Sequence, residues 1–94
     1  MILVIKELSA DIFEITVSSD IATTHKVAIT DETHQSLTGG LVSKESLLEF
    51  SFQFLLEREP NTSIMASFEI TVISRYFPEY KNEVRKWCRV LSSE

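Results

Sequence analysis

The stretch that decides the fold is Ile12-Phe-Glu-Ile-Thr-Val-Ser18, in which apolar and polar side chains alternate. In an extended chain, successive side chains point to opposite faces, so Phe13, Ile15 and Val17 share one face and the polar residues between them share the other. A period of two maintained over this length predicts a strand that buries one of its faces. The rest of the fold can be worked out from this strand in both directions.

Two neighbouring stretches extend the pattern. The preceding one, ILVIKEL, is a compact apolar run rich in β-branched side chains, and the following one, THKVAIT, alternates again. The two connections are short and polar, which favours antiparallel hairpins over crossover connections. The sequence therefore predicts a three-stranded antiparallel meander in sequential order, with strands at about residues 2–8, 12–18 and 24–30.

From Asp31 onward the apolar period becomes helical. Asp31 can cap a short helix, and the glycine pair Gly39-Gly40 can end it in the left-handed conformation. Ser43 can cap a longer helix over about residues 44–59, which the next proline stops. The change of period at this point indicates that the strands come first along the chain and the helices follow.

The last third of the chain is also predicted to be helical. Thr62 or Ser63 can cap a short helix through Phe68, and Pro78 suits the first turn of a final helix. Strands followed by helices indicate the α+β class. We expect a single domain over residues 1–94, in which the meander is followed by and packed against four to five helices.

The predicted helix at residues 44–59 has an unusually wide apolar surface. On a helical wheel its polar residues Ser46, Glu49, Gln53 and Glu57 form one narrow stripe, and apolar residues cover most of the rest. Such a helix is expected to lie at the centre of a domain. The predicted core comprises Leu3, Ile5, Phe13, Ile15, Val17, Val27, Ile29, Leu47, Leu48, Phe54, Leu55, Ile64, Phe68, Ile73, Phe77, Val84 and Trp87.

Charge and cysteine content restrict the classes of partner and compartment. The chain has 14 acidic and 9 basic residues, a net charge of −5, which argues against broad binding to duplex nucleic acid. Cys88 is the only cysteine, so no internal disulfide can form and a reducing compartment is expected. No apolar run approaches the roughly 18 residues of a membrane span, and the N-terminal run is too short for a signal peptide. We therefore expect a cytoplasmic protein without a membrane segment.

Several short motifs between residues 31 and 80 carry a resemblance. These are Leu37-Thr-Gly-Gly40, Phe54-Leu-Leu-Glu-Arg-Glu-Pro60, Ser63-Ile64, Phe68-Glu-Ile70 and Ile73-Ser-Arg-Tyr-Phe-Pro-Glu-Tyr80. The pattern resembles a family of small uncharacterised bacterial proteins. The resemblance implies a small, stand-alone bacterial protein and assigns no activity, cofactor or partner to any residue.

Residues that often carry chemistry are few and do not form a recognised motif. A zinc site needs three or four nitrogen or sulfur ligands, and His25, His34 and Cys88 have the spacing of no known metal motif. Lys44 lies too far beyond Gly40 for a phosphate-binding loop. We therefore assign no catalytic residue, metal ligand or cofactor, and rank a small enzyme third among the possible functions.

Two surfaces remain as binding candidates. The first predicted strand is apolar on both faces yet lies at the edge of the sheet, which invites pairing with another chain. Together with the wide apolar surface of the long helix, this suggests self-association, and the candidate residues are Ile2, Val4, Phe50 and Phe52. The C-terminal helix carries a basic stripe, and the candidate contacts for an anion or a nucleic acid are Lys81, Arg85, Lys86 and Arg89.

These two surfaces indicate only a broad class of function and not a particular activity. The first hypothesis is a non-catalytic protein-interaction module whose partner is a second copy of the chain or another protein. The second is a weak nucleic-acid or anion binder that uses the basic C-terminal helix, although the aromatic residues Tyr80 and Trp87 share the apolar stripe of that helix.

Overall fold

The computed structural model describes residues 2–92, and three antiparallel strands open the chain as the sequence predicts. These strands are β1 (Ile2–Glu7), β2 (Ile12–Ser18) and β3 (Thr23–Ala28). They pair in sequential order, which places β1 at one edge of the sheet. Within β2, the alternation that predicted the strand is reproduced by burial, because Phe13, Ile15 and Val17 are all buried.

A fourth strand, β4 (Ser67–Glu69), makes the sheet mixed instead of purely antiparallel. It lies parallel to β3, with Phe68 opposite Val27. The predicted helix through Phe68 is therefore wrong: Asn61–Ser63 form one turn of 3-10 helix, and the chain then extends into β4. A strand of three residues is too short to show a period in the sequence, and its conformation is set by pairing with β3.

Within residues 2–92, four α-helices follow the meander, and the prediction was four to five. They are α1 (Asp31–Thr38), α2 (Lys44–Leu56), α3 (Val72–Tyr76) and α4 (Tyr80–Ser92). Ser43 caps α2 as expected.

The start and end of α1 are set by side-chain and backbone geometry. The cap of α1 is Thr30, whose hydroxyl accepts a hydrogen bond from the Thr33 amide, whereas Asp31 is already helical. Gly39 ends α1 with φ 65°, the left-handed conformation that glycine adopts at the least cost.

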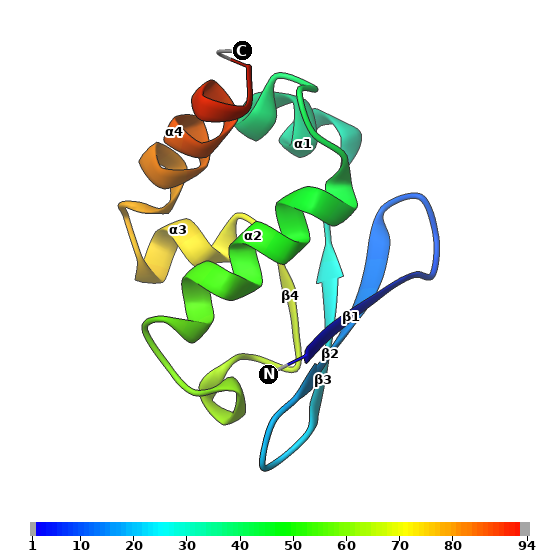
Figure 1. Ribbon diagram of the computed structural model, residues 1–94. Coiled ribbons are helices and arrows are strands. Elements are labelled where there is room, and N and C mark those ends of the chain that lie inside the picture. Colours follow the sequence, from blue (N-terminus) through cyan, green and yellow to red (C-terminus); the bar gives the residue numbers. More distant parts are fainter. Residues whose placement is uncertain (1, 93–94) are drawn as a thin grey trace.

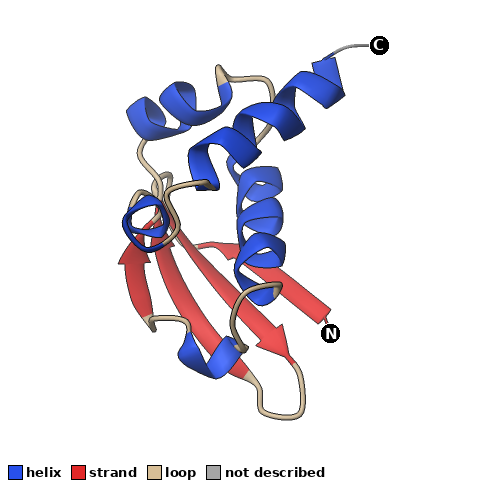
Figure 2. Ribbon diagram, turned by 90° about the vertical axis from the view of Figure 1, so that its left-hand side faces the viewer, coloured by secondary structure: helices blue, strands red, loops and turns tan. Residues whose placement is uncertain are grey.

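The strands form one layer, and the helices gather over one face and around one end of it (Figures 1 and 2). Helix α2 crosses that face and contacts β1, and α4 contacts both α1 and α2. On the opposite face of the sheet, the side chains of Val4, Thr24 and Lys26 are exposed. The structure therefore has one sheet layer and one helical layer, and α2 is the helix that crosses the sheet.

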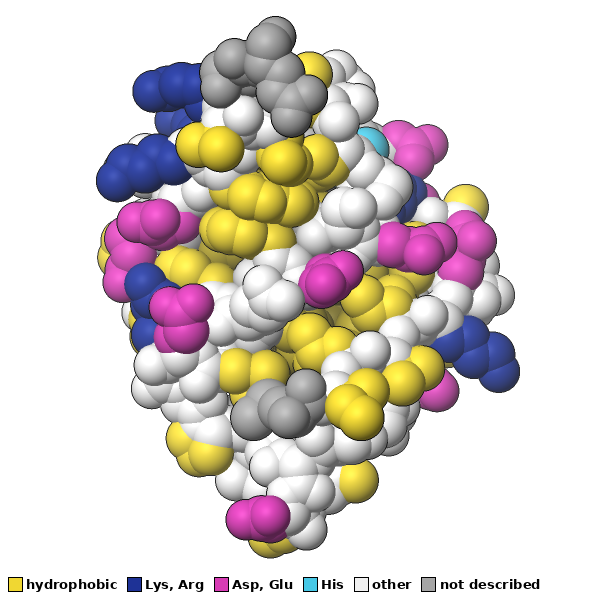
Figure 3. Space-filling model, viewed as in Figure 1, with side chains coloured by type: hydrophobic (Ala, Val, Ile, Leu, Met, Phe, Trp, Pro, Cys, Tyr) yellow, Lys and Arg dark blue, Asp and Glu magenta, His cyan; other side chains and the backbone are white. Residues whose placement is uncertain are grey.

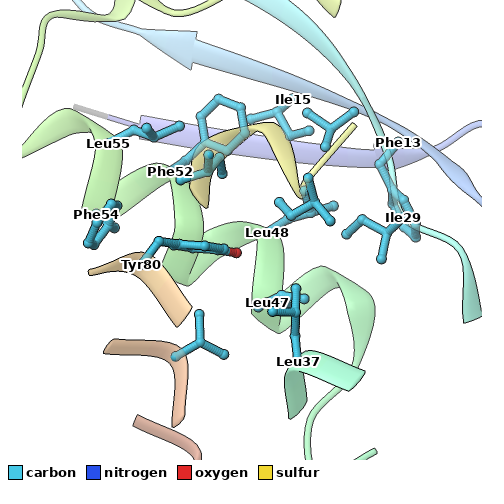
Figure 4. Close-up of a cluster of buried hydrophobic side chains, with 14 of the residues drawn as sticks. Phe13, Ile15, Ile29, Leu37, Leu47, Leu48, Phe52, Phe54, Leu55 and Tyr80 are labelled. Carbon is cyan, nitrogen blue, oxygen red and sulfur yellow. The ribbon is translucent and has the colours of Figure 1, made fainter. Parts of the chain in front are cut away.

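The core lies between α2, the inner face of the sheet and α4. Figure 4 shows Leu48 and Phe52 of α2 between sheet residues such as Ile15 and the ring of Tyr80, and it shows Leu47 beside Leu37 of α1. Most of the predicted core is buried as expected. The predicted core residues that are only partly buried are Leu3, Ile5, Phe68, Phe77 and Trp87, and the buried residues that the prediction lacked are Leu37, Phe52, Ile70, Tyr80 and Cys88.

Candidate interaction surface

The outer edge of β1 presents backbone groups that have no partner strand. The Leu8 amide donates to the Ile12 carbonyl at 2.9 Å, so these residues form a hydrogen-bonded pair. Hydrogen-bonded and non-hydrogen-bonded pairs alternate along an antiparallel ladder, and the register pairs Val4 with Thr16. Val4 therefore bonds to β2, while the amides and carbonyls of Leu3 and Ile5 point outward. Among residues 2–92, β2 is the only strand that pairs with β1.

A groove runs beside this edge, between β1 and the polar stripe of α2. Its volume is about 770 Å³. Leu3 and Ile5 from β1 and Leu56 from α2 form its apolar part, and these three side chains are partly buried. The polar residues that line the groove all come from α2 and its two ends: Ser43, Glu45, Ser46, Glu49, Gln53 and Glu57. The same β1 residues thus offer apolar side chains to the groove and unpaired backbone groups to the edge.

The groove is acidic. Glu45, Glu49 and Glu57 line it, and none of the lysines and arginines that the structure describes does so. Arg58 lies 3.9 Å from Glu57 and 3.5 Å from Glu79, whereas no ion pair within the described part of the chain involves Glu45 or Glu49. Figure 3 looks onto this side of the molecule and shows hydrophobic side chains across its centre with acidic side chains among them, while the lysine and arginine side chains lie toward the margins.

The lysine nearest to the groove in sequence is bound elsewhere. The Lys44 ammonium donates to the Ala10 carbonyl at 2.9 Å and lies 3.2 Å from the Asp11 carboxylate and 2.7 Å from the Asp31 carboxylate. The hydrogen bond with Asp31 raises the pKa of Lys44 and lowers the pKa of Asp31. This cation therefore joins the start of α2 to the turn after β1 and to the start of α1, and it does not pair with Glu45 or Glu49 of the groove.

The residues that the sequence analysis proposed for self-association separate into two groups. Ile2 and Val4 are 65% and 54% exposed on the open face of β1, so they are available for contact. Phe50 is partly buried and stacks on Trp87, with ring centroids 4.5 Å apart. Phe52 is fully buried and lies beside His25 and Phe68, so including it among surface contacts was wrong.

The basic stripe lies on the exposed side of α4, where Lys81, Arg85, Lys86 and Arg89 are all exposed. Lys86 approaches Glu83 at 3.9 Å. The aromatic residues of this helix are turned away from solvent: Tyr80 is buried and Trp87 packs on Phe50. The stripe therefore presents charge without exposed rings from the same helix.

The two histidines make structural contacts. The buried His25 ring bonds through Nδ1 to the Met65 carbonyl at 2.7 Å and through Nε2 to the Thr23 hydroxyl at 2.8 Å. It thereby joins β3 to the segment that leads into β4. His34 Nε2 bonds to the Val42 carbonyl at 2.5 Å, which ties α1 to the start of α2.

Burial raises the pKa of the Cys88 thiol, which favours its neutral form over the thiolate. Within residues 2–92, no group of three or more histidine, cysteine, aspartate or glutamate side chains is placed to hold a metal ion.

A second, smaller hollow of about 360 Å³ lies next to β4, at the other edge of the sheet. Phe68, Val72 and Phe77 contribute to its lining, which is mainly apolar, and Glu59 is the only charged residue in that lining among the residues described. The sequence analysis identified neither hollow. The α2 groove did have a signal in the sequence, because Glu49, Gln53 and Glu57 repeat at the four-residue spacing that puts them on one line of the helix.

No protein-family model, curated protein or solved structure matches this chain. Among the described residues, no helix is both long enough and apolar enough to cross a membrane. The geometry of β1 and its groove is therefore the basis on which we infer function.

Proposed function

We propose that this protein is a small non-catalytic interaction module that binds an extended segment of another protein along β1. The observation that carries the proposal is the coincidence of an unpaired strand edge with a groove. The outward backbone groups of Leu3 and Ile5 can form the hydrogen bonds of an added strand, and the groove can take alternate side chains of that strand. Backbone bonds for affinity and side-chain pockets for specificity are the elements of recognition by strand addition.

The length of the edge sets the size of the bound segment. Strand β1 has 6 residues, which extend over roughly 20 Å. A segment of about six residues pairs along that length and buries an area at the lower end of specific interfaces. We therefore expect a reversible interaction. The absence of a disulfide-forming pair of cysteines supports a cytoplasmic setting for it.

A second copy of the chain is the less favourable occupant of this edge. Two antiparallel β1 strands in one continuous sheet are related by a two-fold axis perpendicular to the sheet, so both α2 helices would lie on the same face. The acidic side chains of the two grooves, among them Glu49 and Glu57, would then face each other across the new seam. Like charges that face each other oppose association. We therefore propose a different protein as the partner.

Selection from a displayed library of random ten-residue peptides tests the proposal. We expect the selected peptides to slow hydrogen exchange at the amides of Leu3 and Ile5 and to leave the amide of Val4, which already bonds to β2, unchanged. Selected peptides that bind without protecting Leu3 and Ile5 would overturn the proposal, as would a selection that yields no binder. Light scattering of the free protein shows whether a dimer occupies the edge instead, and a dimer that protects these amides would also overturn it.

A second candidate function is contact with a polyanion through α4. It is favoured by the alignment of Lys81, Arg85 and Arg89 at four-residue spacing on an exposed helix side. Titration with labelled single-stranded RNA at low and high salt tests it, because binding through cations weakens steeply as salt rises. Affinity that does not depend on salt would contradict this candidate.

A further inference from the structure

We infer that the segment bound along β1 is a cationic strand, in which lysine or arginine alternates with apolar residues and the cations face α2. The inference rests on the proposed function and specifies the chemistry of the partner. It follows from what the two faces of an added strand would meet.

One face of the added strand would look into the groove. The residues of the added strand that pair with Leu3 and Ile5 would point their side chains to the same face as those two residues. There they would lie between the apolar side chains of β1 and the polar stripe of α2. A long cationic side chain suits this position, because its methylene stem can cover Leu3 and Ile5 while its charged end reaches carboxylates. A short or fully apolar side chain would leave the α2 carboxylates without a partner.

The charge of the groove selects cations over other polar groups. Glu45 and Glu49 have no ion pair within the described residues, and Glu57 has Arg58 at 3.9 Å. Three carboxylates along one side of the groove create a negative potential that attracts cations and repels acidic segments. The positive charge of Lys44 does not cancel it, since that side chain is engaged by Asp11 and Asp31.

The other face of the added strand would continue the open face of the sheet. There its side chains would lie beside Ile2 and Val4, which are large, apolar and mostly exposed. Apolar, β-branched residues at these positions would cover Ile2 and Val4 by the cross-strand contacts that stabilise sheets. The two faces together define a pattern in which cationic and apolar residues alternate at every second position.

Three synthetic decapeptides test this pattern against the intact protein. The first alternates lysine and valine, the second has the same composition with the lysines and valines in separate blocks, and the third alternates glutamine and valine. We expect the first to bind at least about tenfold more tightly than the other two at low salt, and to protect the amides of Leu3 and Ile5. We expect its affinity to fall as salt screens the groove charge.

Variants of the protein locate the charge that matters. Glu49→Gln removes an unpaired groove carboxylate, and we expect it to weaken binding of the lysine–valine peptide about threefold, as is typical of one solvent-exposed ion pair. Glu32→Gln removes the same charge from α1, outside the groove, and should leave the affinity unchanged. Both residues are exposed, so neither change is expected to prevent folding.

The outcomes separate this inference from the function on which it rests. Equal binding of the glutamine and lysine peptides, with Leu3 and Ile5 protected, would overturn the cationic partner and keep strand addition. Equal binding of the alternating and blocked lysine peptides, or equal effects of Glu49→Gln and Glu32→Gln, would indicate general attraction to an acidic protein and overturn the inference. No protection of Leu3 and Ile5 by any peptide would overturn the proposed function itself.

Discussion

Replacing Phe52 by alanine tests the assignment of the central helix to the core. The Phe52 side chain is fully buried, with its ring centroid 5.5 Å from that of His25 and 6.3 Å from that of Phe68. Because the wide apolar surface of α2 could equally well face a partner, this position distinguishes a core residue from a surface contact. We expect Phe52→Ala to destabilise the isolated protein strongly.

The magnitude follows from burial. A phenylalanine side chain buries at least about 150 Å² in a core, and at about 25 cal/mol per Å² its removal costs roughly 4 kcal/mol. The value lies within the range of about 3–5 kcal/mol that is typical of such substitutions. A domain of this length is expected to have a free energy of unfolding of about 5–14 kcal/mol, so this substitution removes a large share of it. The melting temperature should fall by about 15–30 °C.

Urea unfolding followed by circular dichroism measures this cost. Tyr76→Ala serves as the control, because Tyr76 is 69% exposed and its loss should change the free energy of unfolding by no more than about 0.5 kcal/mol. If Phe52→Ala and Tyr76→Ala unfold at the same urea concentration, Phe52 is not a core residue. The packing of α2 between the sheet and α4 would then be refuted.

Three further predictions concern single contacts. The Tyr80 hydroxyl lies 2.5 Å from that of Ser51, and burial raises the pKa of Tyr80 above 10.0. The free energy of unfolding should therefore fall as the pH rises past 10.0, because the unfolded chain ionises first. Between pH 8 and pH 11, Tyr80→Phe should lose less stability than the parent protein in unfolding measurements. Lys44 lowers the pKa of Asp31 below 3.8. The pair therefore contributes to the free energy of unfolding above that pH, and this contribution is lost as the pH falls below it. In an acid titration of stability, Lys44→Gln should show a smaller change in this range than the parent protein. Gly39→Ala forces alanine to φ 65° and should cost about 1 kcal/mol in urea unfolding.

Structure could be predicted from the sequence wherever buried and exposed positions alternate at a regular period or a local cap marks the end of a helix. The alternation of Phe13, Ile15 and Val17 predicted β2 because one face of that strand packs on helices and the other is open. Ser43 predicted the start of α2 because a serine hydroxyl there can accept from the first unpaired amides of the helix, and the Ser46 amide does donate to it.

Features that depend on distant parts of the chain were not visible in the sequence. Strand β4 exists because residues 67–69 return to β3 after two helices, and no local period marks them. Similarly, Phe52 and Phe50 both appeared as excess apolar surface on α2. The structure separates them, because the sheet covers Phe52 while Trp87 of α4 covers one face of Phe50.

The candidate site shows the same division. The edge position of β1 and the exposure of Ile2 and Val4 followed from sequential strand order and could be predicted. The groove could not, since it requires the polar stripe of α2 to lie beside β1, a placement set by the packing of the opposite, apolar side of the helix. The stripe that carries Glu49 and Glu57 was therefore visible in the sequence, whereas its position beside β1 emerged only from the tertiary arrangement.

The parallel pairing of β4 with β3 has a consequence for how the chain is made. During synthesis the first three strands leave the ribosome well before residues 67–69, so the far side of β3 stays open until α1 and α2 have emerged and the chain has returned. Unpaired strand edges in partly folded chains promote aggregation. When β4 pairs with β3, the Met65 carbonyl comes within hydrogen-bond distance of the His25 ring. This bond joins the segment before β4 to the three strands that were synthesised first. Chains that stop before Met65 would expose the six-residue edge of β3 in place of the three-residue edge of β4, so we expect them to aggregate more readily than the complete chain.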